Sequence, residues 1–276
     1  MNNIMIITVD VGGTKTLIAS FDKSGTRGPE LRFETPKNEA AFLERLVTTI
    51  QAVYPDNAKM DAISVALPGM FSQPGMLDYA PNLGWRHINI QKQLNAHFTC
   101  PIFVENDANL AGLAEARALK VTPPLCIYVT VSTGIGTGII TNGQITPELS
   151  QSEGGHMVLE YDGVLRSWES FASGNSIHLT YGKYGYEITS KRTWTEIADK
   201  ISRGLLALIP LLQPDVIIIG GSIGTHFEHY GITLRRILEQ KLEKTNISVP
   251  TIKQAAHPQE AVIYGCYYYA VDHLTR

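Results

Sequence analysis

The chain has 276 residues, 44% hydrophobic and 18% charged, which indicates a globular protein large enough for one large domain or, as we expect, two medium ones. With 23 basic and 26 acidic side chains, its formal net charge of −3 gives no electrostatic reason to expect a nucleic acid or a membrane surface as a partner. Three widely separated cysteines exclude a disulfide framework and a Cys-rich metal site, and we expect buried thiols in a reducing cytoplasm.

The first apolar run ends in Asp10 and continues into Gly12, Gly13, Thr14 and Lys15. Because Asp10 interrupts the run and no basic region precedes it, the run predicts a core strand, neither a signal peptide nor a membrane span. Glycines let backbone N–H groups approach an anion, Thr14 and Lys15 supply donors, and Asp10 is placed to hold a hydrated divalent cation. The same residues equally fit a β-hairpin turn in which the glycines only supply positive φ, so both interpretations stay open for this stretch alone.

The first half of the chain then alternates strands and helices, which predicts an antiparallel meander followed by an α/β layer. Strands are expected over residues 16–22, 31–34, 61–67 and 101–104. Helices are expected over residues 38–53, with Asn38 as N-cap, 90–98 and 107–119. Pro123-Pro124 cannot continue a helix and marks a linker.

The second half repeats the opening pattern. A β-rich run over 125–131 leads into a Gly/Thr turn over 132–138, a strand to Thr141 and an Asn142-Gly143 hairpin turn. Two Gly-rich turns that face one cleft are a sharper signal than either alone. Further on we expect helices over about 193–212, 226–244 and 259–274, and a strand over 215–219 that ends in Gly220-Gly221.

Five motifs occur in the order seen in the ROK family of sugar kinases and sugar-responsive repressors, and the chain resembles that family over nearly its whole length. They are Asp10-Val11-Gly12-Gly13-Thr14-Lys15, Glu105-Asn106-Asp107, Ser132 to Gly138, Glu153-Gly154-Gly155-His156 and Gly220-Gly221-Ser222-Ile223-Gly224. The resemblance implies an α/β, two-lobed actin-like ATPase (RNase H-like) fold with duplicated βββαβα-type domains. We expect residues 1–118 plus 259–276 in the N-terminal lobe and 119–258 in the C-terminal lobe, with MgATP and a hexose in the cleft.

Asp107 is the candidate general base, because a carboxylate that accepts the proton of a sugar hydroxyl lowers the barrier to phosphoryl transfer, typically by ~10²–10⁴-fold. Asn106 can both donate to and accept from sugar hydroxyls. The resemblance implies the same base. The alternative for this pair is an Asn-Asp helix N-cap.

On the sugar side, the resemblance implies that Asn82 contacts a ring hydroxyl and that Glu153, His156 and Glu169 reach the sugar. Trp85, three residues after Asn82, is expected to pack in the core. The family's histidine usually also binds zinc, together with a Cys-rich element.

No cysteine lies between His156 and Glu169, and a structural zinc needs four ligands, so we predict no zinc. The loop is then expected to be held by packing of apolar side chains. These are Val158, Leu159, Leu165, Trp168 and Phe171.

The two Gly/Thr turns are expected to hold the nucleotide phosphates, with Mg²⁺, bound through water, near Asp10. The second turn contributes Thr133, Gly134 and Gly136, and Thr137 either narrows it or adds a hydroxyl donor. Gly220 and Gly221 resemble the family's adenosine-side motif, where missing side chains leave room for the base and ribose.

The predicted function is ATP-dependent phosphorylation of a hexose or N-acylhexosamine of the glucose, ManNAc or GlcNAc type, at the 6-hydroxyl, by a cytoplasmic homodimer. A non-catalytic sugar-binding relic of the regulatory branch competes with it, although the chain begins directly at the first strand, without a helix-turn-helix. A third hypothesis is a kinase for another acceptor, such as a β-glucoside, fructose or a smaller polyol. Two tyrosine groups, 181–186 and 267–269, are expected to cover a core or a subunit interface.

Overall fold

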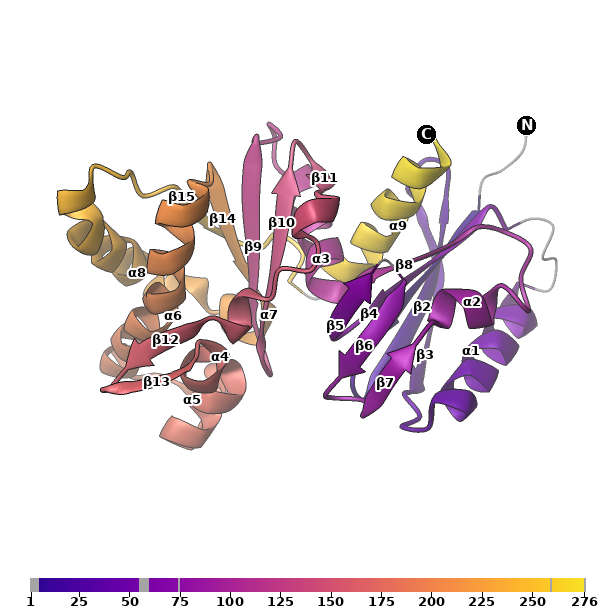
Figure 1. The fold of residues 1–276 in the computed structure, drawn as a ribbon, viewed down its shortest axis with the longest axis horizontal. Helices are drawn as coiled ribbons and strands as arrows, with labels where there is room; N and C mark the ends of the chain where they lie inside the picture. The colour runs from indigo at the N-terminus through magenta and orange to yellow at the C-terminus, as the bar shows by residue number, and fades with distance from the viewer. Residues whose placement is uncertain (1–4, 55–59, 74, 259, 276) are drawn as a thin grey trace. The chain divides into compact units, whose positions relative to one another are not determined.

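The computed structural model describes residues 5–54, 60–73, 75–258 and 260–275. The chain divides into two compact units, Met1–Ala114 with Glu260–Arg276, and Glu115–Gln259. We call them unit 1 and unit 2 and describe each by itself (Figure 1).

Unit 1 is built on a five-stranded sheet in the order β3-β2-β1-β4-β8. Its strands are β1 (Met5–Val11), β2 (Lys15–Asp22), β3 (Arg27–Glu34), β4 (Ala62–Leu67) and β8 (Ile102–Asn106). The first three strands pair antiparallel, which confirms the predicted meander, whereas β1–β4 and β4–β8 pair parallel. Strands β1 and β4 are buried almost throughout, as expected where helices cover a sheet on both faces.

The helices of unit 1 are α1 (Glu39–Val53), α2 (Ile90–Leu94), α9 (Ala261–Leu274) and α3 (Asp107–Arg117), whose last three residues lie beyond Ala114 and belong to unit 2. The Asn38 side chain accepts a hydrogen bond from Ala41 N at 3.0 Å, so the predicted N-cap of α1 is confirmed. Helix α9 packs Ile263, Tyr267 and Ala270 into a cluster with residues of β1, β2 and β4. A separate three-stranded sheet, which the sequence did not predict, contains β5 (Met70–Gln73), β6 (Met76–Ala80) and β7 (Trp85–Ile88).

Unit 2 repeats the sheet of unit 1, in the order β11-β10-β9-β14-β15. Its strands are β9 (Leu125–Val131), β10 (Ile135–Thr141), β11 (Gln144–Ile145), β14 (Val216–Gly220) and β15 (Thr251–Gln254). The first two pairings are antiparallel and the last two parallel, as in unit 1. Asn142 and Gly143 adopt φ of 51° and 73°, which confirms the predicted hairpin turn.

The helices of unit 2 are α4 (Glu169–Ala172), α5 (Gly174–Tyr181), α6 (Lys191–Leu212), α7 (Gly221–Gly224) and α8 (Phe227–Leu242). Short 3₁₀ helices cover Pro147–Leu149, Gly154–His156, Gly185–Glu187 and Glu243–Thr245. A two-stranded hairpin, β12 (Val158–Tyr161) and β13 (Val164–Ser167), follows His156, where the sequence predicted only a loop. The core of this unit is built around two large, fully buried rings, Trp168 and Tyr230.

Cys100, Cys126 and Cys266 are free and buried, as predicted. Of the helices in the described ranges, none is both long enough and apolar enough to cross a membrane.

Candidate functional site

The first glycine turn joins β1 to β2 as a tight hairpin, in which Gly12 N donates to Lys15 O at 2.9 Å. A Cβ on Gly12 would lie 2.8 Å from that oxygen, so the turn requires glycine there. The backbone is therefore a hairpin turn, as the alternative interpretation held, but neither Gly12 nor Gly13 has positive φ, so that interpretation is wrong about what the glycines supply. They allow close approach of the backbone, and the hairpin does not exclude a phosphate site.

The carbonyl oxygens of this turn accept hydrogen bonds from Thr35 and Lys37, which follow β3. Thr35 Oγ1 donates to Gly12 O at 2.9 Å and Thr35 N donates to Thr14 O at 2.9 Å. The Lys37 ammonium donates to Gly13 O at 2.7 Å. The N–H groups of Gly13 and Thr14 have no hydrogen-bond acceptor within the described residues. A turn whose carbonyls are occupied and whose N–H groups are unpaired presents donors to an anion.

Lys37 also joins this turn to the predicted sugar-side loop. Its ammonium donates a second hydrogen bond, at 2.6 Å, to Asn82 O, and Trp85 Nε1 donates to Lys37 O at 2.8 Å. A Cβ on Gly13 would lie 3.1 Å from Asn82 Cβ, so the two segments approach closely. Trp85 is buried beside Phe42, with ring centroids 4.8 Å apart, which confirms its place in the core. Sequence reasoning missed Lys37, because a lysine in a loop carries no motif.

Two carboxylates lie within electrostatic reach of each other in unit 1. Asp10 is near the end of β1, and Asp107 is the first residue of α3. Burial, followed by the charge of Asp107, raises the pKa of Asp10 to about 7. Burial raises the pKa of Asp107 to about 6, although hydrogen bonds that include the 2.9 Å bond from Ala108 N oppose the shift. These carboxylates fit a divalent cation, because a positive charge beside them would offset the burial of two negative charges.

Asn106 caps the helix that carries Asp107. Its Oδ1 accepts from Ala108 N at 2.8 Å and from Asn109 N at 3.3 Å, while Nδ2 donates to Gly69 O at 3.0 Å. The N-cap alternative is therefore true of Asn106. It leaves one amide N–H of Asn106 outside these bonds, and it fixes the start of α3, where the candidate base sits.

The second glycine turn joins β9 to β10 in unit 2. Ser132 N donates to Gly134 O at 2.9 Å, and Gly174 N donates to Ser132 O at 2.6 Å. Within the part of the chain that the structure describes, Thr133 N and Gly134 N have no acceptor, so this turn also presents donors. Gly136 lies inside β10, one residue beyond the turn.

Glu169, the first residue of α4, connects this turn to His156. Its Oε2 accepts from Ile135 N at 3.4 Å and would lie 2.8 Å from a Cβ on Gly134. Its Oε1 lies 3.6 Å from His156 Nδ1. The structure thus brings together two of the predicted sugar-side residues and the second turn.

Thr137 holds the loop that carries Glu153. Its buried Oγ1 donates to Ser152 O at 3.2 Å and accepts from Gly154 N at 2.9 Å. Of the two roles left open for this threonine, the structure favours a hydroxyl donor, but the hydroxyl is directed to the loop backbone on both sides of Glu153. The loop backbone also passes close to β10, because a Cβ on Gly155 would overlap Ile135 O.

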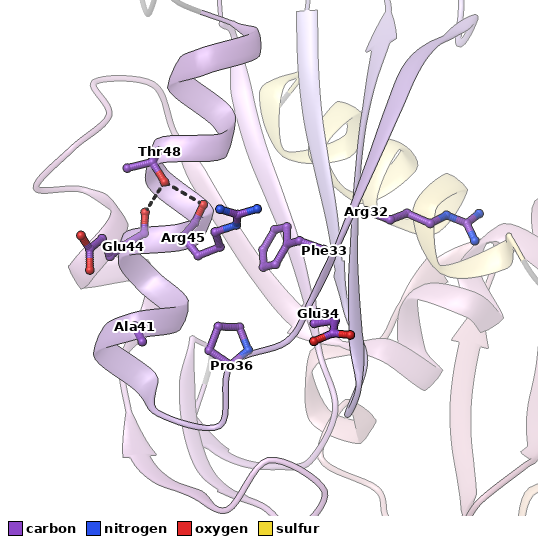
Figure 2. A pocket seen from close by; sticks show the side chains of 8 residues that line it. All are labelled: Arg32, Phe33, Glu34, Pro36, Ala41, Glu44, Arg45 and Thr48. Atoms are coloured by element: carbon purple, nitrogen blue, oxygen red, sulfur yellow. Dashed lines mark hydrogen bonds between the residues drawn. The ribbon is translucent and has the colours of Figure 1, made fainter.

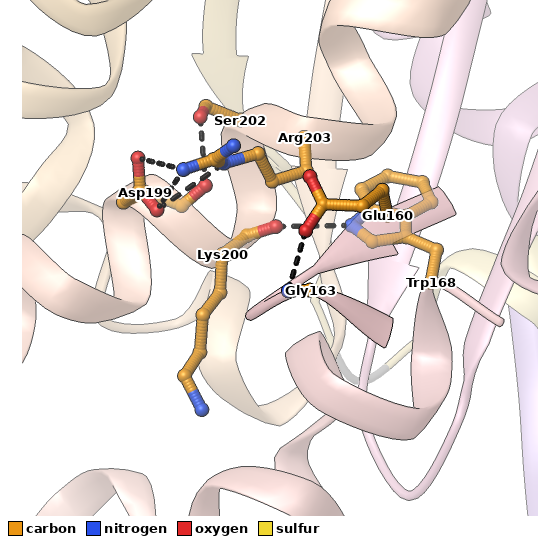
Figure 3. Close-up of polar contacts among 7 residues, drawn as sticks. All are labelled: Glu160, Gly163, Trp168, Asp199, Lys200, Ser202 and Arg203. Carbon is orange, nitrogen blue, oxygen red and sulfur yellow. Dashed lines mark hydrogen bonds and ion pairs between the residues drawn. The ribbon is translucent and has the colours of Figure 1, made fainter. Parts of the chain in front are cut away.

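The β12–β13 hairpin after His156 is held from one face by aromatic packing. Tyr161 stacks on Phe171 with centroids 4.4 Å apart. The fully buried Trp168 donates from Nε1 to Lys200 O at 3.2 Å (Figure 3). Helix α6 accommodates that indole only because Gly204 has no side chain.

The predicted packing of this segment needs a correction. Trp168 and Phe171 are buried and Leu159 packs against the same core, as expected. Val158 and Leu165 are 66% and 72% exposed, because they point away from that core on the hairpin's other face.

The residues around His156 do not fit a structural zinc. Glu169 is the one carboxylate paired with His156 in the described residues, and the three cysteines are buried elsewhere. In the described ranges, one group of three His, Cys, Asp or Glu side chains is close enough to share a metal ion. It consists of His226, Glu228 and His229, which follow β14 in the sequence, and it does not include His156. Two ligands cannot complete a tetrahedral zinc site.

Gly220 and Gly221 end β14 and begin α7. Gly221 has φ of +78°, and a Cβ there would lie 2.6 Å from Val131 O. Glycine is therefore required by the backbone next to the second turn. The adenosine role of this pair stays a prediction.

A hollow of about 560 Å³ lies elsewhere in unit 1, between β3 and α1 (Figure 2). It is open and lined by charges of both signs, including Arg32, Arg45, Glu34 and Glu44. None of the predicted site residues lines it, and we assign it no role.

The sheets and their glycine turns define an actin-like ATPase fold. The ROK family model matches residues 6–273, and the chain belongs to the ROK family of sugar kinases and regulators. It is 27% identical over 241 residues to a putative fructokinase of Bacillus subtilis, with 79% of this chain and 77% of that protein covered. It is 31% identical over 125 residues to the xylose repressor of the same species, covering 42% of this chain and 32% of the repressor.

A solved structure is similar throughout. The ROK family glucokinase from Streptomyces griseus, in complex with glucose and AMPPNP, superposes with a TM-score of 0.80 at 21% identity, covering 97% of this chain and 99% of that one. ROK kinases of this kind have the two-lobed actin-like ATPase fold, and this chain has it too.

Proposed function

We propose that this protein is an ATP-dependent sugar kinase that phosphorylates a hexose or N-acylhexosamine at the 6-hydroxyl. The observation that carries the proposal is the carboxylate of Asp107, raised to a pKa of about 6 at the start of α3 beside Asp10. A base of that pKa is mostly ionised at neutral pH and is stronger than a solvated carboxylate, which suits general-base catalysis. The S. griseus enzyme, bound to glucose and AMPPNP, supports a sugar and a nucleotide as the ligands.

In the proposed reaction, Asp107 accepts the proton of the sugar hydroxyl as its oxygen forms a bond to the γ-phosphorus, and the bond to the ADP oxygen breaks. The unpaired N–H groups of Gly13 and Thr14 and those of Thr133 and Gly134 bind phosphate oxygens. Asp10 would hold Mg²⁺ through water, and the ion would supply positive charge that offsets the charge of the phosphates.

The proposed nucleotide residues also include Gly12, Lys15 and Gly136, whereas Gly220 and Gly221 adjoin the adenosine. Among the proposed sugar residues, Asn82 and Asn106 come from unit 1, and Glu153, His156 and Glu169 come from unit 2. We propose that the sugar loop works without zinc, since Thr137 and the β12–β13 hairpin hold it instead. A cytoplasmic homodimer remains the proposed working form.

A kinase for another acceptor is favoured by one comparison, the putative fructokinase. A sugar-binding regulator is favoured by another, the xylose repressor, although the match to that protein covers under half of this chain. The presence of Asp10 and Asp107 favours a catalytic function, because a regulator needs neither a cation ligand nor a general base.

The test is a coupled ADP-release assay with MgATP and a panel of glucose, mannose, fructose, N-acetylmannosamine, N-acetylglucosamine and a β-glucoside. We expect ADP release with at least one free aldohexose or N-acylhexosamine, and a phosphate on O6 of the product by NMR. Sugar binding by calorimetry without ADP release across the panel would overturn the kinase proposal. Turnover of fructose or of the glycoside alone would move it to the other acceptor class.

A further inference from the structure

Three metal-ligating side chains gather where the short helix α7 ends and α8 begins. His226, Glu228 and His229 each offer one ligand atom, and these atoms all lie within 4.8 Å of one another. His229 Nε2 and Glu228 Oε1 are 3.5 Å apart. The cluster lies in unit 2, and none of its members belongs to the proposed sugar or nucleotide residues.

The two imidazoles are held in place by their surroundings. Trp194 of α6, which is buried and donates from Nε1 to Ile188 O, has its ring centroid 5.6 Å from that of His226 and 5.4 Å from that of His229. The two histidine rings are nearly parallel, at 17°, with centroids 6.2 Å apart. Ring positions fixed by packing reduce the ordering that ligation would otherwise require.

The backbone fixes the same two residues. His226 N donates to Ile223 O at 3.1 Å, and His229 N donates to His226 O at 3.0 Å. A Cβ on Gly185 would lie 2.9 Å from His226 Cδ2, so this ring fits against the turn at Gly185 only because no side chain is there.

We propose that His226, Glu228 and His229 bind one divalent transition-metal ion, with Zn²⁺ as the preferred ion. Two imidazoles and one carboxylate form a donor set that suits Zn²⁺, Co²⁺ or Ni²⁺, not Mg²⁺ or Ca²⁺, which favour oxygen. With metal–ligand distances of about 2.0–2.2 Å, the ligand atoms of a tetrahedral site lie roughly 3.3–3.5 Å apart. To reach that spacing the ligand atoms must move closer together, and the exposed side chains of Glu228 and His229 are the ones free to adjust.

The charge at the site is compatible with a cation. The start of a helix is the positive end of its dipole and disfavours a cation. Glu228 in the first turn of α8 offsets that effect, and the partly exposed position leaves the remaining coordination site to water. The bound ion would hold the α7–α8 junction together, and His226 is five residues beyond Gly221 in the sequence.

The test uses the full, tag-free chain after treatment with a chelator, and it does not depend on kinase activity. Calorimetry with Zn²⁺ should give about one ion per chain. Titration with Co²⁺ or Ni²⁺ should quench tryptophan fluorescence, because Trp194 is beside both imidazoles, and Trp194→Phe should remove most of the quenching.

Four variants assign the ion. His226→Gln with His229→Gln should abolish binding, and Glu228→Gln, at an exposed residue that does not endanger folding, should weaken it at least ~10-fold. His87→Gln is the matched control, because His87 Nδ1 lies 3.5 Å from Asp78 Oδ1 in a histidine–carboxylate pair to which the described residues add no third ligand. It should change nothing.

His156→Gln distinguishes this site from the zinc position of the family. If His156→Gln removes the zinc and the double histidine variant keeps it, the proposal fails, as does the proposed zinc-free sugar loop. No binding of Zn²⁺ up to millimolar concentration, or equal stoichiometry in the double variant, also overturns it.

Discussion

The two sheets of this protein share the same strand order and pairing directions, and a position near the glycine turn carries a different kind of side chain in each. In unit 1, Asp10 pairs with Leu17 of β2 and with Ala66 of β4. In unit 2, Thr130 pairs with Gly136 of β10 and with Gly220 of β14. A carboxylate in the first sheet thus corresponds to a hydroxyl in the second.

The glycine turns beyond these positions differ in the same way. The carbonyls of the first turn are held by the hydroxyl and amide of Thr35 and the ammonium of Lys37, close to two carboxylates. The second turn is held by the backbone of Gly174 and by Glu169. Both turns present N–H groups to an anion, but proton transfer and cation binding have candidate groups in unit 1. The duplicated backbone offers a phosphate-binding turn in each unit, whereas proton transfer and cation binding are expected in unit 1 alone.

The largest expected effect is at Asp107, the candidate base that unit 1 has and unit 2 lacks. Asp107→Asn should lower kcat by ~10²–10⁴-fold, because the amide cannot accept the hydroxyl proton. In the parent, kcat/KM should fall as the pH drops below about 6, since protonation of this carboxyl removes the base. Nucleotide affinity should stay within a few-fold of the parent's.

Asp22→Asn, an exposed change in the same unit, is the control and should keep full activity. A pH profile that stays flat from 5 to 8, or an Asp107→Asn enzyme with parental kcat, would exclude Asp107 as the base.

Burial of the Asp10 carboxylate is expected to lower the stability of the folded protein. Its folded-state pKa of about 7 is above the ordinary value of 3.8, so the native state binds more protons between these values and loses stability as the pH rises through them. Asp10→Asn should therefore raise the free energy of unfolding by roughly 1–3 kcal/mol at pH 8 without Mg²⁺, and by less at pH 5. Urea unfolding at the two pH values measures the difference.

Asp22 gives the opposite sign, because hydrogen bonds from Ser24 lower its pKa. Asp22→Asn should lose stability above the ordinary carboxyl pKa, not gain it. An Asp10→Asn protein that is less stable at pH 8 than at pH 5, relative to the parent, would show that the Asp10 carboxylate is not under strain.

Lys37 tests whether the first turn and the Asn82 loop act together. Lys37→Met removes charge-assisted hydrogen bonds to Gly13 O and Asn82 O, which are worth about 1.5–3 kcal/mol each when buried and less at this exposed position. We expect KM to rise about 10-fold for both ATP and sugar, with partial rescue by Lys37→Arg. Lys92→Met, also on an exposed lysine of unit 1, should change neither. A rise in one KM alone would separate the two segments.

Much of this organisation could be predicted from local sequence signals. Turn residues and caps act over a few positions, so Asn38 and Asn142-Gly143 were placed correctly. The β12–β13 hairpin was missed, because its faces are defined by α6, whose Gly204 admits Trp168 from more than thirty residues away. Lys37 was missed for a related reason: its two acceptors are main-chain oxygens, which leave no trace in residue type.

Thr137 should give the smallest effect and the most selective one. Thr137→Val keeps the shape but loses the bonds to Ser152 O and Gly154 N, at a cost of about 1–2 kcal/mol, with Gly154 N left unpaired. Because these bonds hold the loop of Glu153 and not the second turn, KM for the sugar should rise about 5-fold while KM for ATP stays unchanged. Thr137→Ser, which keeps the hydroxyl, should restore the sugar KM. An equal rise in both KM values would mean that Thr137 supports the phosphate turn. The functional difference between the two units would then depend on Asp10 and Asp107 alone.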